Sequence, residues 1–265
     1  GLWVAPGFID PHTHYLDDLT STDATRRALP AGLMQGVTTV FVGNDGSSAR
    51  DGVGATFDRM RERGIGPNVA SYVGFGTVRR AVMGEADRAA TDDERARMGA
   101  LVDRAMCEGA LGLSTGLFYA PQSYAATDEL IGLARHAARH GGVYDSHLRD
   151  ESSYGLGLLG AVREALEIGE AAELPVHIAH IKALGADVQG QSGAVIALVE
   201  QARARGLTVH ADQYPWDASG TGLAAALLPR WAQADGDAAL IARLDDPEQA
   251  ARIRAAMADN LRRRG

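Results

Sequence analysis

The fold is decided by one stretch near the start of the chain, Pro6-Gly7-Phe8-Ile9-Asp10-Pro11-His12-Thr13-His14. Phe8 and Ile9 indicate a buried strand, and two histidines follow it at once. Because side chains two residues apart on a strand point the same way, His12 and His14 are predicted to project to one side, close enough to share a metal ion. A hydrogen-bonded histidine pair without a metal is the alternative that this stretch alone leaves open.

The composition is that of one large globular domain. The chain has 265 residues, of which 46% are hydrophobic and 23% are charged, so it can bury a sizeable core. A net charge of −8 argues against a nucleic-acid partner, because phosphate binding needs a basic surface. The apolar runs are too short to span a membrane, and we expect a soluble, cytoplasmic protein without membrane contacts. Cys107 is the only cysteine, which excludes an internal disulfide framework.

Short apolar segments alternate with amphipathic helical patterns along the chain. Seven strands are predicted, at residues 4–9, 38–42, 68–73, 112–114, 142–146, 174–179 and 207–211. Helices are predicted at residues 23–35, 51–64, 92–108, 127–140, 156–172, 190–205 and 237–263. The strands lack strict alternation of apolar and polar residues, which is typical of parallel strands covered on both faces.

Seven successive strand–helix units predict an α/β fold, a (β/α)8 TIM-like barrel that is incomplete, with about seven strands present. Residues 1–265 are therefore expected to form a partial barrel domain. A doubly wound sheet is the rival architecture. It is less favoured because no Gly-x-Gly-x-x-Gly turn follows the first strand, as a nucleotide-binding version of that sheet would often show.

Polar residues follow the predicted strands at their carboxyl ends, which is the face where barrels carry active sites. These residues are His12, His14, Asp45, His147, His180 and Tyr214. Four imidazoles and one carboxylate suit zinc or a similar divalent ion, which at an open coordination position would activate water. Taken singly, each histidine has the alternative of a hydrogen-bonded core or rim residue, and Asp45 that of a turn residue in Gly43-Asn44-Asp45-Gly46.

The other four histidines have different settings. His136 and His140 are four apart on a helix, a spacing that can bind metal, but two flanking arginines favour a solvated cationic helix end. His177 has the opposite strand parity to His180 and is predicted to face the helix layer. His210 is expected to lie deeper inside the barrel, with a structural role.

Several motifs resemble those of a known family. The stretch 6–14 resembles the opening motif of the amidohydrolase superfamily, and Gly36–Gly46 looks like the second-strand motif of N-acyl-D-amino-acid deacylases, or D-aminoacylases. Similar later motifs are Gly109–Tyr119, Ser146–Arg149 and Ala179–Lys182. The resemblance runs from Gly1 to about Gly222. It implies hydrolysis of N-acyl-D-amino acids to a D-amino acid and a carboxylate, with one or two zinc ions held by His12, His14, Asp45, His147 and His180.

Two departures from the family pattern stand out. Family members often carry a metal-binding cysteine where this chain has Asp45, and a carboxylate is a harder ligand that can bridge two ions, so the identity and number of the metals stay open. The family also uses an aspartate after strand eight for proton transfer. No eighth strand is predicted, so that aspartate is expected beyond Gly265. Together with the start at Gly1 and the lack of the family's flanking β-sandwich, this indicates a fragment that is inactive by itself.

The family resemblance also implies substrate-binding residues. Lys182 lies two residues after His180 and could pair with a substrate carboxylate, although a surface lysine is the alternative. Tyr119 and Tyr214 could donate hydrogen bonds to a carbonyl or carboxylate. The expected partner is a small N-acyl amino acid, and the oligomeric state is left open. Two alternatives remain: another amidohydrolase, such as a cyclic-amide hydrolase or a deaminase, or a catalytically inactive metal-binding barrel.

Overall fold

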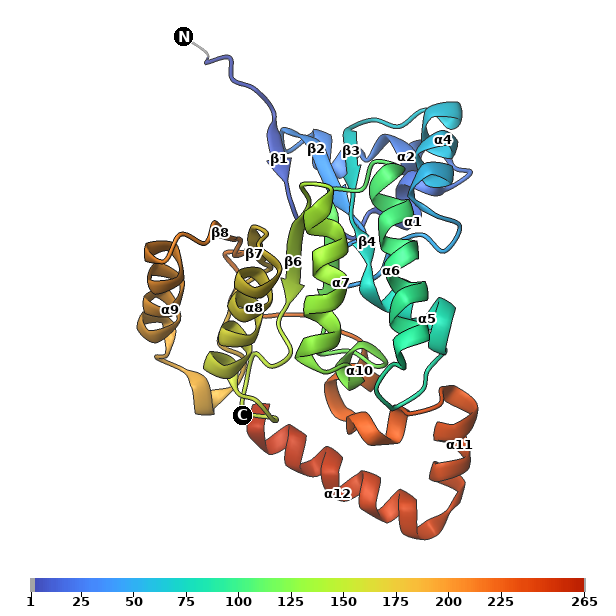
Figure 1. Cartoon of the computed structure of the whole chain (residues 1–265), viewed down its shortest axis with the longest axis vertical. Coiled ribbons are helices and arrows are strands. Elements are labelled where there is room, and N and C mark those ends of the chain that lie inside the picture. Colours follow the sequence, from blue (N-terminus) through green and yellow to red (C-terminus); the bar gives the residue numbers. More distant parts are fainter. Residues whose placement is uncertain (1–2, 265) are drawn as a thin grey trace.

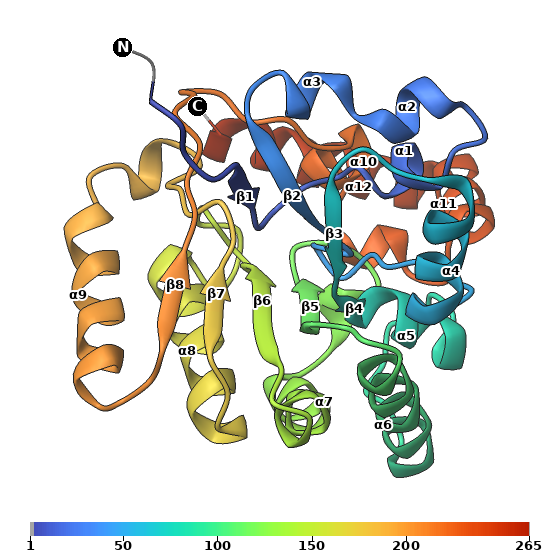
Figure 2. The same ribbon diagram turned by 90° about the horizontal axis from the view of Figure 1, so that it is seen from above.

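The computed structural model describes residues 3–264, and parallel strands form its centre (Figures 1 and 2). The first sheet has the order β1 (Phe8–Asp10), β2 (Val37–Val42) and β3 (Asn68–Ser71). The second has the order β4 (Val73–Gly74), β5 (Gly112–Gly116), β6 (Val143–His147), β7 (Val176–Ile178) and β8 (Val209–Ala211). Only Tyr72 separates β3 from β4, so the two sheets form one series of seven strand positions. The predicted fold class, a partial barrel of parallel strands, is confirmed.

Helices connect the strands and cover their outer face. The longer ones are α4 (Val53–Arg63), α5 (Phe75–Met83), α6 (Asp92–Cys107), α7 (Thr127–Arg139), α8 (Leu158–Ala172) and α9 (Ser192–Ala204). The main core lies between the strands and helices α6 to α9 (Figure 2). Leu113, Tyr144 and Ile178 from the strands are fully buried against helical residues such as Leu133 and Ile168. This packing fixes the direction in which each strand ends, and hence where its terminal side chains lie.

The remaining elements have five residues or fewer, apart from α11 and α12. They are α1 (Leu16–Thr20), α2 (Ala24–Ala28), α3 (Pro30–Leu33), α10 (Leu223–Leu227), α11 (Asp237–Asp245), α12 (Pro247–Arg264), η1 (Gln122–Tyr124), η2 (Ala186–Val188) and η3 (Arg230–Gln233). Figure 1 shows α10, α11 and α12 beyond the carboxyl end of β6. The buried side chain of Ile253 anchors α12, and Asn260 donates a 2.9 Å hydrogen bond to the carbonyl of Leu227. Within residues 3–264, no helix combines the length and the apolar character that crossing a membrane requires.

Two predicted helices are each divided in two, for the same physical reason. The helix predicted at 23–35 breaks at Leu29, which has a φ of 46° and precedes Pro30. The helix predicted at 237–263 breaks at Asp246, which is extended and precedes Pro247. A proline ring clashes with a helical conformation of the residue before it. The sequence prediction also missed α5, which begins directly after β4.

The strand predicted at residues 4–9 is shorter and more exposed than expected. β1 spans only three residues, and the side chains of Phe8 and Ile9 are 69% and 63% exposed. The prediction of a buried strand is wrong here because β1 pairs with β2 on one side only. β8 likewise pairs only with β7, so β1 and β8 are the two edges of the open barrel within the described part of the chain.

Candidate active site

The predicted site residues converge on one cavity at the carboxyl ends of the strands. His12 and His14 lie in the loop after β1, Asp45 follows β2, His147 ends β6, and His180 lies just past β7. The cavity has a volume of about 590 Å³, and all eight predicted residues line it: His12, His14, Asp45, Tyr119, His147, His180, Lys182 and Tyr214. Segments far apart in the sequence therefore meet here, as the barrel fold predicts.

Asp45 is presented by a tight turn after β2. It has a φ of 54°, in the left-handed region that aspartate tolerates better than most residues. Gly43 and Gly46, at the two ends of this turn, also have positive φ, and a side chain at Gly46 would clash with Gln122. The Gln122 amide donates a 2.9 Å hydrogen bond to the Asp45 carbonyl. Asp45 is thus a turn residue, one of the two roles considered, and the turn aims its carboxylate at the histidines.

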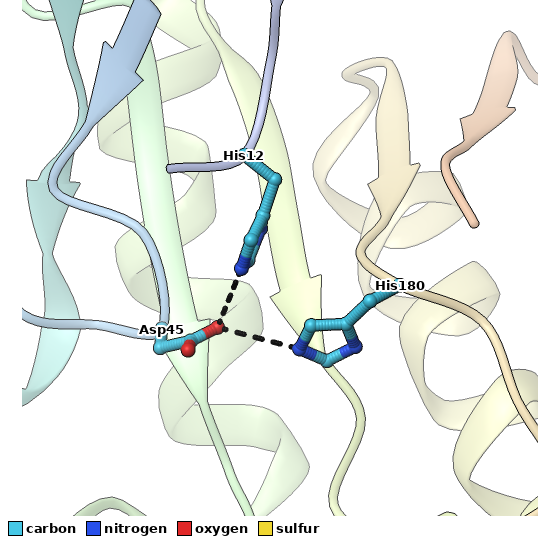
Figure 3. A group of neighbouring side chains, drawn as sticks. All are labelled: His12, Asp45 and His180. Carbon is cyan, nitrogen blue, oxygen red and sulfur yellow. Dashed lines mark ion pairs between the residues drawn. The ribbon is translucent and has the colours of Figure 1, made fainter. Parts of the chain in front are cut away.

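The Asp45 carboxylate faces four imidazoles. Its Oδ1 lies 3.5 Å from His12 Nε2 and 3.8 Å from His180 Nε2 (Figure 3). The same oxygen lies 3.4 Å from His147 Nδ1, and Oδ2 lies 3.6 Å from His14 Nε2. These distances exceed those of ordinary N–H···O hydrogen bonds. Two ligand atoms about 2.0–2.1 Å from one tetrahedral zinc ion would be roughly 3.3–3.4 Å apart. The spacing therefore fits ligands arranged around a common cation.

Three atoms at the centre of this cluster are buried and have no hydrogen-bond partner. They are His12 Nε2, Asp45 Oδ1 and His147 Nδ1. A buried polar atom without a partner is costly and calls for an explanation. A divalent cation would satisfy all three at once, so the residues present fit a metal ion.

A second cluster adds Glu151, which the sequence prediction did not select as a ligand. Its side chain is buried, and its carboxylate lies 3.3 Å from His180 Nδ1 and 4.0 Å from His147 Nε2. His12, Asp45 and His180 form one group able to hold a metal, and His147, Glu151 and His180 form another. His180 belongs to both. The sequence did offer a signal for selecting Glu151 as a ligand, because it lies in the loop that follows His147.

The environment favours the metal-binding protonation states of His12 and Asp45, whereas it favours the protonated form of His180. Burial lowers the pKa of His12, which keeps its ring neutral near pH 7. Burial would raise the pKa of Asp45, but the imidazoles of His147, His12 and His180 around its carboxylate hold that pKa well below its usual range. For His180, contact with Glu151 outweighs burial and raises the pKa. A neutral imidazole and an ionised carboxylate are the forms that bind metals.

The three predicted substrate residues line the same cavity. Lys182 Nζ lies 2.5 Å from Glu151 Oε1 and 5.8 Å from the centre of the Tyr214 ring. Because its side chain is only 17% exposed, Lys182 is not a free surface lysine. The Tyr119 ring lies 4.8 Å from that of His147. Burial raises the pKa of Tyr119 to about 12, so its hydroxyl stays protonated and able to donate.

The prediction that His177 faces the helix layer is wrong. Its Nδ1 lies 2.7 Å from Asp145 Oδ1 and its Nε2 lies 3.2 Å from Asp212 Oδ2, inside the barrel. β7 ends at Ile178 and His180 has a φ of 35°, so strand parity no longer relates the two histidines. His210 pairs in register with His177 but is exposed rather than deep inside the barrel, because β8 is an open edge.

The helical pair His136 and His140 has a structural role. Both imidazoles contact Asp103 on α6, at 2.8 Å and 3.2 Å respectively. Arg139 contacts the same carboxylate at 3.2 Å. The four side chains tie the end of α7 to α6, so this cationic helix end is paired and half-buried rather than freely solvated.

Comparisons with known proteins agree with this architecture. Residues 1–212 match the model of the Amidohydrolase family, and the chain belongs to that family. It is similar to a D-aminoacylase of Alcaligenes xylosoxydans xylosoxydans, with 39% identity over 83% of this chain and 49% of that protein. The chain spans about half the length of the curated relatives it matches.

Two solved structures extend the comparison. A D-aminoacylase with a binuclear metal centre matches with a TM-score of 0.72 and 35% identity, over 80% of this chain and 48% of that one. An N-acyl-D-glutamate deacylase from Bordetella bronchiseptica, in complex with zinc and a phosphonate inhibitor, matches with a TM-score of 0.73 and 34% identity over the same shares. The resemblance predicted from the motifs is therefore confirmed at the level of the family.

The ion pairs of His177 predict a pH-dependent stability. Hydrogen bonds to Asp145 and Asp212 outweigh burial and raise the pKa of His177 to about 9, above an ordinary value of about 6.5. Its contribution is therefore complete below about pH 6.5 and lost as the pH rises through about 9. We expect this contribution to the free energy of unfolding to reach roughly 3 kcal/mol, measured by denaturant unfolding at several pH values.

Two variants test the assignment of this pH dependence to His177. His177→Gln should remove the pH-dependent part of the free energy of unfolding, and His210→Gln should keep it. Equal pH profiles of stability for the wild type and His177→Gln would contradict the assignment.

Proposed function

We propose that the protein containing this chain is a metal-dependent hydrolase that cleaves the amide bond of N-acyl-D-amino acids, giving a D-amino acid and a carboxylate. The observation that carries this proposal is the Asp45 carboxylate surrounded by four imidazoles at the carboxyl ends of the barrel strands. The similarity to D-aminoacylases supports the substrate class. Because the chain spans about half of those relatives, the activity is proposed for the whole protein.

The proposed metal ligands are the five predicted residues together with Glu151. Two groups that share His180 provide positions for one or two zinc ions, and the metal centres of the two solved relatives support this cofactor. Asp45 adds an oxygen ligand that also suits other divalent metals. A zinc ion held there would polarise an acyl carbonyl and lower the pKa of water.

Lys182, Tyr119 and Tyr214 are proposed to orient the substrate. The ammonium of Lys182 is half-enclosed and lies beside the ring of Tyr214, where it would bind the α-carboxylate of the amino acid. The Tyr119 hydroxyl, held protonated by burial, would donate to the acyl carbonyl. A base for proton transfer is proposed to come from the part of the protein beyond Gly265.

A second cavity suggests where the acyl group lies. It has a volume of about 600 Å³ and shares His14, Asp45 and Tyr119 with the first cavity. Its other lining residues include Leu16, Ala224, Ala225 and Gln233, and Lys182 is not among them. If the carboxylate binds Lys182 and the scissile carbonyl lies at Asp45, the acyl group extends into this second cavity.

A substrate panel tests the proposed function. We expect the full-length protein to hydrolyse N-acetyl-D-amino acids, but not their L-enantiomers, hydantoins, dihydropyrimidines or purines. Removal of divalent metal by a chelator should abolish the activity, measured as release of free amine, and added zinc should restore it. Turnover of cyclic amides or purines alone would favour the alternative amidohydrolase, and no turnover together with bound metal would favour the inactive barrel. Activity that survives complete metal removal would contradict the metal-dependent mechanism.

Lys182→Ala tests carboxylate recognition. With an N-acetyl-D-amino acid, we expect kcat/KM to fall by at least about 30-fold, which corresponds to about 2 kcal/mol. The C-terminal amide of the same compound lacks the carboxylate, so its kcat/KM should fall much less. The measurement is the ratio of kcat/KM between the two substrates. Glu151→Gln, which alters the metal cluster, should lower kcat/KM for both substrates by the same factor. Equal losses in Lys182→Ala would exclude a carboxylate contact.

Ala225→Trp tests the direction of the acyl group. The indole would fill part of the second cavity, so we expect kcat/KM to fall at least tenfold for an N-hexanoyl substrate and to change little for the N-formyl derivative of the same D-amino acid. Ala242→Trp, on the exposed face of α11, is the matched control and should affect neither substrate. An unchanged ratio in Ala225→Trp would place the acyl group elsewhere.

A further inference from the structure

His180 takes part in both metal clusters although its backbone is strained. It lies beyond the end of β7 and has a φ of 35°, an uncommon value for a residue other than glycine. Such a conformation costs on the order of 1–3 kcal/mol and persists only where the surrounding structure holds it in place. The imidazole reaches Asp45 through Nε2 and Glu151 through Nδ1 only because the backbone turns at this point.

One residue on the neighbouring strand end holds the chain around His180. The carboxylate of Asp212 accepts a 2.5 Å hydrogen bond from the backbone N–H of His180. The backbone carbonyl of Asp212 accepts a 2.9 Å hydrogen bond from the N–H of Ile181, and its N–H donates to the carbonyl of Ile178 at 3.2 Å. Asp212 is therefore attached to the backbone before, at and after the strained residue.

Asp212 is held in turn by a partly buried ion pair with His177. His177 lies between the carboxylates of Asp212 and Asp145, at 3.2 Å and 2.7 Å. The side chain of Asp145 is fully buried on β6, and that of His177 is 12% exposed. These contacts join the three adjacent strands β6, β7 and β8 below the metal clusters. Neither His177 nor Asp145 belongs to either cluster.

We propose that Asp145, His177 and Asp212 form a positioning network that orients His180 and thereby sets the affinity of both clusters for divalent cations. This inference rests on the proposed metal ligands. Because His180 is shared, the network acts on both clusters together. Residues that orient metal ligands in this way typically change metal affinity by about 10- to 100-fold when they are replaced.

The test measures metal binding by the full-length protein without using its activity. Zinc affinity and stoichiometry are measured by calorimetry, and the geometry of the ligands by the absorption spectrum of bound cobalt. We expect Asp212→Ala and His177→Gln to weaken binding by about 10- to 100-fold. Asp212→Asn keeps an oxygen that can accept from the His180 N–H, so it should recover part of the affinity. His210→Gln, in the adjacent register position, should bind as wild type does.

The outcomes separate this inference from the proposed function. If Asp212→Ala and His177→Gln bind zinc with wild-type affinity and show the wild-type cobalt spectrum, the network is only structural and the inference is overturned, even if thermal stability falls. A loss confined to one of two bound ions would also overturn it, because His180 serves both. A wild-type protein that binds no divalent metal would instead overturn the proposed function. If Asp212→Ala fails to fold, Asp212→Asn and His177→Gln provide the same comparison.

Discussion

A single carboxylate, that of Asp45, faces nitrogen atoms of four imidazoles contributed by three other strand ends. The side chain of His14 is 70% exposed, but the other four are largely buried. The lone pairs of those four groups repel one another, or their polar atoms lack hydrogen bonds, unless a proton or a cation lies between them. The orphaned atoms at the centre show that protein contacts do not satisfy this requirement. Four elements bring this carboxylate and these imidazoles together: the loop after β1, the turn after β2, and the ends of β6 and β7.

The candidate site also depends on the contacts that fix the backbone conformation of His180. Ordinary ladder hydrogen bonds stop before His180, so its orientation is set by side chains on the neighbouring strands rather than by its own strand. The ion pairs of His177 bring the buried carboxylate of Asp145 and the partly buried carboxylate of Asp212 together without leaving like charges unpaired. The candidate ligand and substrate residues line one cavity, and this network connects the strands that carry His147 and His180.

Much of the fold could be predicted because the repeated strand–helix pattern is local. The predicted strands and most helices correspond to those in the structure. The prediction missed the helix breaks at Leu29 and Asp246, although the prolines that follow them were a signal for both. The exposure of β1 could not be predicted from the apolar residues Phe8 and Ile9. It depends on whether another strand pairs with that edge of the sheet. The facing of His177 was missed because strand parity applies only while the strand continues.

The sequence alone determined the fold class, the family and the set of residues that converge, since motif spacing and strand ends are encoded locally. It also placed an aspartate at position 45, after the second strand. Tertiary structure alone decided that Glu151 joins His147 and His180, that Lys182 is enclosed, and that Asp212 holds the backbone of His180. These contacts join residues on different loops and strands, and their geometry depends on the curvature and register of the sheet, which no local pattern specifies.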